Sequence, residues 1–318
     1  MPKKSQIKLN EKHKQILDYL FYNCRFTTKQ LSRALNIPQQ TISYMIKWLE
    51  KNRYAERYDA ILNWNNLPLI KCLYLFNIKD LDKTIKSMIN QKPIFGIYEY
   101  IGTHNLAIWC FFKNEAQQEN FEKIFLEKKS LIYKKINIIH NFYPNLNPFE
   151  TKIKLNAPLI SQKQLKKIKL DKKDILLIKY LSSGNARDSL LKISENTGLS
   201  YDVVRYRMNI IIKNGYFARF MAQIGKNPEG ITTSPLLFKL KKIDELIIKK
   251  LENLNFIVLG AHSKNIIHLS IFSINHKDFI NKLSILEKIL REKVISTEIL
   301  YYKQSHLANR FPLDFLIN

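Results

Sequence analysis

One stretch of sequence decides the fold because it occurs twice. Residues 23–60 read NCRFTTKQLSRALNIPQQTISYMIKWLEKNRYAERYDA, and residues 185–222 read NARDSLLKISENTGLSYDVVRYRMNIIIKNGYFARFMA. The two align without a gap at a constant offset of 162. The identical positions are Asn23/Asn185, Arg25/Arg187, Ser32/Ser194, Tyr44/Tyr206, Lys51/Lys213, Asn52/Asn214, Tyr54/Tyr216, Arg57/Arg219 and Ala60/Ala222. Apolar positions correspond as well, so the pattern predicts an internal duplication.

Within each copy, the periodicity predicts three short helices. In the first copy, a helix over 9–22 is followed by a second helix that opens at Thr27, with Gln30 at the spacing of a capping box. A third helix begins at Pro38, and Ile42, Ile46 and Leu49 share one face of it at i, i+4 and i+7. Residues 54–58 then read as a strand, the start of a wing or a hinge. This order predicts a winged helix-turn-helix in each copy.

The outward face of each third helix carries polar side chains suited to DNA. A helix fits the major groove, where Gln bonds adenine, Arg bonds guanine, and Ser, Tyr and Lys reach phosphates. The alternative is a protein-binding platform, which three-helix motifs also form. The predicted DNA contacts are Gln39, Gln40, Ser43, Tyr44, Lys47, Tyr201, Asp202, Arg205, Tyr206, Arg207, Asn209 and Lys213.

A second type of domain follows each helix-turn-helix. Runs of apolar strand and amphipathic helix predict the order βαββαβ in both halves, a ferredoxin-like fold whose open sheet face needs a partner. Predicted elements are 69–76, 81–90, 93–101, 105–112, 115–130 and 132–141 in the first half, and 236–240, 243–254, 256–259, 266–274, 276–292 and 294–302 in the second. The fold class is therefore α+β, duplicated.

A hairpin motif and a linker complete the repeat. Gly102-Thr103-His104 matches Gly260-Ala261-His262, each between two strand-like runs, and each is either a ligand-binding turn or a simple exposed turn. A Pro- and Lys-rich stretch separates the halves, with a lysine cluster between Lys163 and Lys173. The predicted domains are helix-turn-helix units at 1–64 and 169–232, ferredoxin-like domains at 65–144 and 233–318, and a linker at 145–168.

Charge is the strongest global signal. The 318 residues include 52 Lys and Arg against 27 Asp and Glu, a net charge of +25, which attracts polyanions such as nucleic acids. Apolar runs are too short to cross a bilayer, and no signal core follows the basic start, so we expect a cytoplasmic protein. Three scattered cysteines and seven histidines show no spacing of metal ligands, so neither metal nor cofactor is predicted.

The chain resembles the leucine-responsive regulator/AsnC family of transcription factors. The resemblance rests on Leu170-Asp171-Lys172-Lys173-Asp174, on Gly198-Leu199-Ser200, on Lys213-Asn214-Gly215-Tyr216, and on the order of elements after them. It implies an N-terminal DNA-binding unit and a C-terminal ligand-sensing domain of the RAM or ACT-like type, which dimerises through its sheet and takes effectors such as amino acids. The family hairpin usually reads Gly, aromatic, Asp, whereas this chain has His104 and His262.

We therefore predict a sequence-specific transcription regulator that is not an enzyme. It would bind double-stranded DNA as an intramolecular pseudo-dimer and respond to a small, amino-acid-like effector at residues 102–104 and 260–262, with pairing of whole chains into a homodimer or higher oligomer left open. Two alternatives remain. Siroheme decarboxylases resemble the same regulators and would use His104 and His262. A tandem winged-helix replication initiator fits the helix-turn-helix units but not the βαββαβ order.

Overall fold

The first three-helix unit forms as predicted. The computed structural model describes residues 9–127, 131–152, 170–225, 227, 229–291 and 293–307. Its first helices are α1 (Glu11–Tyr22), α2 (Thr28–Leu35) and α3 (Gln39–Lys51). The capping box is present: Gln30 N donates to Thr27 Oγ1 at 3.2 Å, and Thr27 N donates to Gln30 Oε1 at 2.9 Å. The predicted apolar face of α3 is buried against the other two helices.

The second unit repeats this arrangement with α6 (Lys172–Leu181), α7 (Leu190–Thr197) and α8 (Tyr201–Lys213). Asp171 caps α6 by accepting from Lys173 N and Asp174 N. Gly198 ends α7 with φ +69°, in the left-handed region that glycine adopts without a steric cost. Most of the predicted linker, with its lysines from Lys163 to Lys169, lies outside the described residues.

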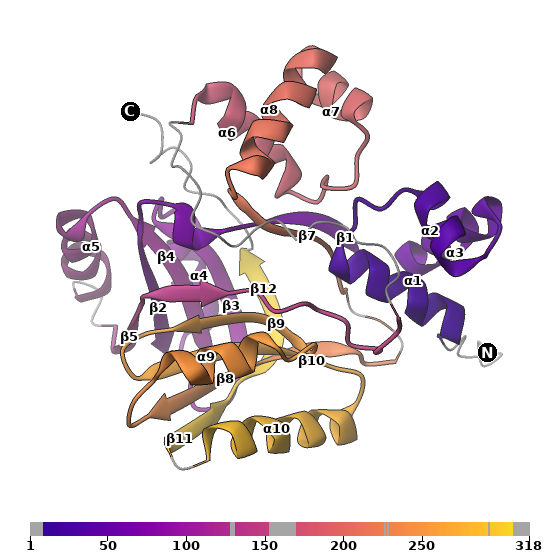
Figure 1. Ribbon diagram of the computed structural model, residues 1–318. Coiled ribbons are helices and arrows are strands. Elements are labelled where there is room, and N and C mark those ends of the chain that lie inside the picture. Colours follow the sequence, from indigo (N-terminus) through magenta and orange to yellow (C-terminus); the bar gives the residue numbers. More distant parts are fainter. Residues whose placement is uncertain are drawn as a thin grey trace, which may run out of the picture.

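A two-stranded ribbon joins the two units. The strand expected at 54–58 is β1 (Arg57–Leu62), and it pairs antiparallel with its counterpart β7 (Phe217–Gln223). Ala60 lies opposite Phe220, so the two copies meet about a local pseudo-two-fold axis. The strand is therefore paired within a ribbon rather than free as a wing. Helices α6–α8 lie above this ribbon, and α1–α3 lie to the right of it (Figure 1).

Each downstream domain has the predicted ferredoxin-like order. A short turn, η1 (Trp64–Asn66), precedes the first sheet. The elements of the first domain are β2 (Ile70–Phe76), α4 (Leu81–Met88), β3 (Ile94–Ile101), β4 (Leu106–Phe112), α5 (Glu115–Phe121), a π-helical turn η2 (Glu122–Glu127) and β5 (Tyr133–Ile138). Those of the second domain are β8 (Thr232–Leu240), α9 (Glu245–Glu252), β9 (Ile257–His262), β10 (Ile266–Ser273), α10 (His276–Leu290) and β11 (Val294–Ile299). The four predicted strands of the first sheet are arranged β3-β4-β2-β5, and those of the second sheet are arranged β9-β10-β8-β11.

The two sheets exchange their last strands, which the sequence did not predict. The strand expected over 132–141 breaks at Ile139: β5 stays in the first sheet, and β6 (His140–Phe142) adds to the second sheet beside β9. In the same way β12 (Tyr301–Leu307) follows β11 and pairs with β3 of the first sheet. Each five-stranded sheet thus ends in a strand from the other half, and this ties the halves together.

The predicted partner for each open sheet face is the other sheet. The outer faces are covered by α4 and α5 on one sheet and by α9 and α10 on the other, each over its own apolar core. The inner faces share one core with the helix-turn-helix units, in which Trp109 of β4 meets His268 of β10 at a ring distance of 5.3 Å. Within the described ranges, no helix is long and apolar enough to span a bilayer.

Candidate nucleic-acid interface

Helix α3 presents the residues that the sequence predicts. Gln39, Gln40, Tyr44 and Lys47 are exposed, and the Tyr44 side chain is the most open of the large apolar groups on this helix at 69%. Ser43 is half-buried, and its hydroxyl donates to Gln39 O at 3.0 Å. Gln39 Nε2 donates to Thr28 Oγ1 at 3.0 Å. Gln39 is therefore held against α2, which leaves Gln40, Tyr44 and Lys47 as the outward set.

Helix α8 presents a different outward set. Tyr201, Asp202, Arg205, Tyr206 and Asn209 are exposed, as is Lys213 at the end of the helix. Arg205 and Asp202 lie one turn apart with an N–O distance of 3.5 Å. Because both side chains are open to solvent, this ion pair is weak, and the guanidinium can exchange it for a base or a phosphate.

Arg207 is tied to the inside of its own unit, so the structure does not support its predicted role in reading DNA. Its guanidinium pairs with Asp171 at 2.7 Å and with Asp174 at 3.2 Å, and Asp174 is only 2% exposed. These contacts fasten α8 to the capped start of α6. The sequence placed Arg207 at the edge of the outward face, and helical periodicity alone does not show an ion pair with a neighbouring helix.

The two helix-turn-helix units contact each other through two equivalent arginines, each of which hydrogen-bonds to the backbone of the opposite unit. Arg25 donates to Ala186 O at 2.7 Å, and its repeat partner Arg187 donates to Cys24 O and, at 3.1 Å, to Phe26 O. Each guanidinium also lies over an aromatic ring on the ribbon, Arg25 over Phe220 at 5.7 Å and Arg187 over Tyr58 at 5.4 Å. The identity of positions 25 and 187 was visible in the sequence, but their role was not.

The predicted effector residues do not form matching sites. Gly102 and Thr103 form the exposed turn between β3 and β4, whereas Gly260, Ala261 and His262 lie within strand β9. The predicted correspondence of the two triplets is therefore wrong, because the second hairpin turns only after His262. Gly260 is needed there for space: a Cβ at that position would lie 2.0 Å from the ring of Phe142, which the exchanged strand β6 brings in.

His104 and His262 meet different partners. His104 Nδ1 lies 3.0 Å from Glu298 Oε2, and Lys134 holds the other oxygen of the same carboxylate at 2.6 Å. His262 lies opposite His140 of β6, with a ring distance of 5.9 Å. The sequence did not single out His140 as its partner, because only the strand exchange brings the two together.

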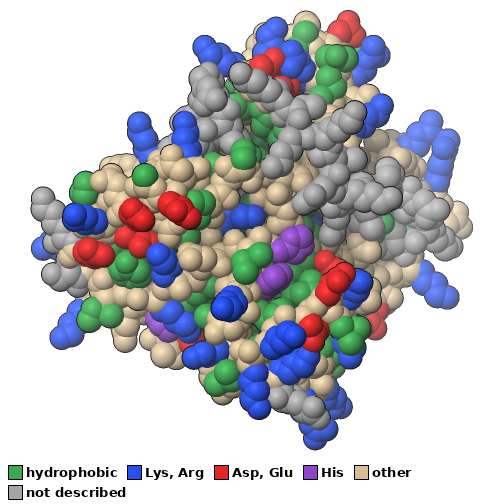
Figure 2. All heavy atoms as spheres, turned by 60° about the vertical axis from the view of Figure 1, so that its left-hand side comes forward, with side chains coloured by type: hydrophobic (Ala, Val, Ile, Leu, Met, Phe, Trp, Pro, Cys, Tyr) green, Lys and Arg blue, Asp and Glu red, His purple; other side chains and the backbone are tan. Residues whose placement is uncertain are grey.

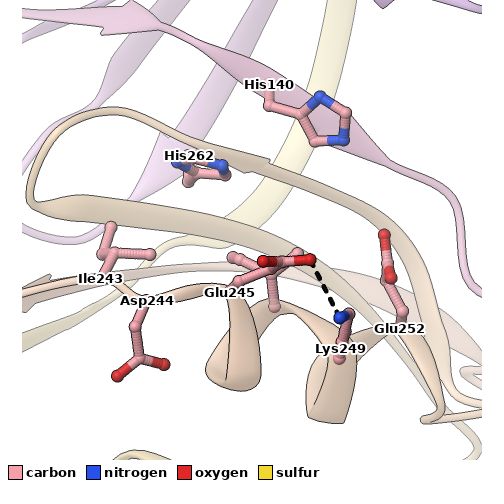
Figure 3. A pocket seen from close by; sticks show the side chains of 8 residues that line it. His140, Ile243, Asp244, Glu245, Lys249, Glu252 and His262 are labelled. Atoms are coloured by element: carbon pink, nitrogen blue, oxygen red, sulfur yellow. Dashed lines mark ion pairs between the residues drawn. The ribbon is translucent and has the colours of Figure 1, made fainter. Parts of the chain in front are cut away.

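His140 and His262 line a pocket of about 350 Å³ beside α9 (Figure 3). Glu245 and Lys249 form an ion pair at 2.9 Å on its helical wall, and Glu252 lies on the same wall. Burial, together with His262 and Lys71, lowers the pKa of His140, so this ring is neutral at pH 7. Among the described residues, no group of three His, Cys, Asp or Glu side chains is placed to hold a metal ion.

The excess of basic over acidic side chains is visible at the surface of the protein (Figure 2). On the face drawn in Figure 2, Lys and Arg are spread widely, whereas the acidic side chains gather in a few small groups. A positive field of this kind attracts the phosphate backbone from a distance and does not depend on base sequence. The exposed residues of α3 and α8 are the ones that the sequence predicts to contact bases.

Comparison with known proteins supports a DNA-binding unit in the first half. Residues 9–55 match the family described as winged helix-turn-helix DNA-binding. An uncharacterized HTH-type transcriptional regulator of Pyrococcus abyssi is 24% identical over 119 residues, which cover 36% of this chain and 80% of that protein. This relative is of the kind that the resemblance to the leucine-responsive regulator/AsnC family predicts.

Solved structures confirm the duplicated architecture. The siroheme decarboxylase NirDL has a TM-score of 0.59 and 9% sequence identity, and the match covers 96% of each chain. NirDL in complex with an iron-uroporphyrin III analogue has a TM-score of 0.57 and 10% identity, covering 96% of this chain and 95% of that one. At such low identity, the likeness shows the shared fold and leaves the function to be argued from the residues.

Proposed function

We propose that this chain is a cytoplasmic, sequence-specific transcription regulator that acts as an intramolecular pseudo-dimer. Its residues 9–55 match the winged helix-turn-helix DNA-binding family, which supports the proposal. The observation that carries the proposal is the pair of exposed, polar third helices, α3 and α8, held about the β1–β7 ribbon on a strongly basic protein. Each helix would enter a major groove, and the ribbon would set the distance between the two half-sites.

The outward residues make the half-sites different. Gln40 and Tyr44 on α3 face one half-site, whereas Tyr201, Arg205 and Tyr206 on α8 face the other. A single chain would therefore favour an asymmetric operator, unlike a dimer of identical chains. Pairing of whole chains into a larger oligomer is compatible with this arrangement and is read out by the size of the protein–DNA complex.

The test is selection of tight-binding duplexes from a random pool, followed by fluorescence anisotropy on the selected site. We expect affinity to fall steeply with salt, because phosphate contacts release counterions. Arg205→Ala should weaken binding to the selected site by about 5- to 150-fold, the equivalent of about 1–3 kcal/mol for a base contact. Arg291→Ala, an exposed arginine at the far end of α10, is the matched control and should leave the affinity unchanged.

Two outcomes count against the proposal. If no duplex is enriched over the starting pool, sequence-specific binding is absent. If Arg205→Ala binds the selected duplex as tightly as the parent, the assignment of the α8 face is wrong. The amino-acid-like effector at Gly102–His104 and Gly260–His262 remains a prediction, and a thermal-shift screen of the amino acids checks it directly.

A tetrapyrrole enzyme is the second candidate function. It is favoured by one observation, the whole-chain likeness to NirDL, which has been solved with an iron-uroporphyrin III analogue. The two histidines predicted for that chemistry do not share one site here, since His104 contacts Glu298 and His262 faces His140. A Soret absorption band in the purified protein, or a saturable shift of the Soret band of iron uroporphyrin when the protein is added, would favour this enzyme over the regulator.

A further inference from the structure

A cavity of about 680 Å³ lies between the two sheets, under one end of the ribbon. Its roof is formed by Arg57 and Ile61 of β1 and by Met221 and Gln223 of β7. Its walls come from both sheets and include seven aromatic side chains: Trp64, Phe95, Tyr98, Tyr100, Trp109, Tyr143 and Tyr302. A volume and a lining of this kind are typical of sites for small organic molecules.

The repeat shows that this cavity belongs to one end of the ribbon. Arg219, the repeat partner of Arg57, is 6% exposed and donates to Pro144 O at 2.6 Å. There the segment after β6 closes the space, and Tyr143 donates to Leu62 O at 2.9 Å. The Arg57 side chain, by contrast, is 40% exposed and lines the cavity. Two copies of one sequence have thus diverged, one toward a closed end and one toward an open space.

The polar groups of the cavity define the ligand they would accept. His268 is 6% exposed, and its Nδ1 has no hydrogen-bond partner among the described residues, which is costly unless a ligand supplies one. Burial lowers its pKa to about 4, so at pH 7 the ring is neutral and offers one donor and one acceptor. One guanidinium nitrogen of Arg57 lies 2.9 Å from the Asp59 carboxylate, and the guanidinium has further N–H donors that can bind an anion.

The other charged lining residue lies at the rim. Glu56 is exposed and forms an ion pair with Arg53, so it adds no free charge to the aromatic walls. Flat apolar walls, a neutral imidazole and one guanidinium together fit a planar aromatic ligand that carries an acidic group. Stacking on the rings would provide most of the burial, and the acid would face Arg57.

We propose that the cavity between the sheets is a binding site for a planar aromatic acid, and that its occupancy sets the position of the β1–β7 ribbon. This regulatory role rests on the proposed function, because both helix-turn-helix units are attached to the ribbon that forms the roof. A ligand that binds one ribbon position better than another shifts the spacing of α3 and α8, and hence the affinity for DNA.

The test uses 8-anilinonaphthalene-1-sulfonate, a fluorescent aromatic acid with a flat naphthalene ring and a sulfonate, with the full chain and no DNA. We expect saturable binding of one equivalent. Ser270→Phe, which fills the cavity from β10, should weaken binding at least tenfold. Ser296→Phe, the same change at an exposed position of β11, is the matched control and should bind like the parent. Unchanged thermal midpoints show that the variants are folded.

If Ser270→Phe does not fold, a second variant and a fluorescence measurement test the same site. Val258→Phe fills the same cavity from β9. In a Trp48→Phe background the only tryptophans are Trp64 and Trp109, both in the cavity wall, so the probe should quench their emission with the same saturation. If folded Ser270→Phe or Val258→Phe binds the probe like the parent, or if that quenching is absent, the site does not exist.

A last measurement distinguishes failure of the ligand site from failure of the proposed DNA-binding function. The affinity for a selected duplex is measured with and without saturating probe, and we expect at least a threefold change that Ser270→Phe abolishes. If the probe binds but DNA affinity stays constant, the coupling through the ribbon is wrong. If the protein binds no DNA at all while the probe still binds as predicted, the ligand site stands and the proposed function fails.

Discussion

The two halves of this chain make the same contacts where one helix-turn-helix unit touches the other, but they differ at the two ends of the β1–β7 ribbon. Arg25 and Arg187 make matching contacts with the backbone of the opposite unit. Arg57 and Arg219, also identical in sequence, do not match: one is half-exposed over a cavity, and the other is buried against Pro144. A shared residue therefore keeps its role only where its partners are duplicated along with it.

The difference between the arginines has a physical cause. Arg219 receives its partner from the segment that follows β6, and burial lowers its pKa to about 10, which still leaves it charged at pH 7. Arg57 receives Asp59 as its partner, whereas the repeat position of Asp59 is Met221. The exchange of Asp59 for Met221 at the repeat position, together with the segment after β6, thus distinguishes the closed end of the ribbon at Arg219 from the open end at Arg57.

The largest effect is expected from removing the two ribbon arginines in turn. Arg219→Ala should lower the free energy of unfolding by about 3–4 kcal/mol, because it empties a buried site and leaves Pro144 O without its donor. Arg57→Ala should cost about 1–2 kcal/mol, because its side chain is partly solvated, although buried Asp59 loses its cation. Urea unfolding at pH 7 measures both, and equal losses would show that the two ends are energetically alike.

Two buried titratable groups, one in each half, should change the free energy of unfolding in opposite directions as the pH falls. His268, in the second half, has a pKa lowered to about 4 by burial, below its usual 6.5. The unfolded chain then binds more protons than the folded one, so stability is lost as the pH falls from 6.5 toward 4. Between pH 7 and pH 5, His268→Gln should remove about 2 kcal/mol of this loss. Urea midpoints at pH 7, 6 and 5 measure it, and an unchanged pH dependence would place His268 in water.

Asp18, in the first half, shifts stability the other way. It is fully buried on α1 and accepts from Phe149 N and Thr151 N, both at 3.1 Å. Burial outweighs these bonds and raises its pKa from 3.8 to about 6, so the folded chain binds more protons and gains stability as the pH falls through 6. Asp18→Asn removes this gain, so in the same titration its stability should fall more steeply with acid than that of the parent.

The smallest effect concerns the reciprocal arginines. Arg25→Ala and Arg187→Ala should each cost about 1 kcal/mol, through lost hydrogen bonds to carbonyls and lost cation–π contact. The two losses should be equal, since the contacts correspond at the offset of 162. Urea unfolding of the two single variants is the measurement. A twofold difference between the two losses in free energy of unfolding would mean that the contacts of the two arginines are not equivalent.

Much of the fold was predictable because it depends on local patterns. The capping box at Thr27, the face of Ile42, Ile46 and Leu49, and the βαββαβ order all follow from helical and strand periods that operate within a few residues. Most of the outward residues of α3 and α8 followed in the same way. Gln39, Ser43 and Arg207 differ, because their side chains bond to groups of the protein itself, which helical periodicity does not show.

By itself, the sequence determined the duplication, the two helix-turn-helix units and the polar outward faces of their third helices, since these arise from repeats and periodicity along the chain. Only the tertiary structure decided the exchange of β6 and β12, the meeting of His140 with His262, and the cavity beneath Arg57. These features join residues far apart in the chain. Their geometry is set by how two sheets pack on each other, which no local pattern encodes.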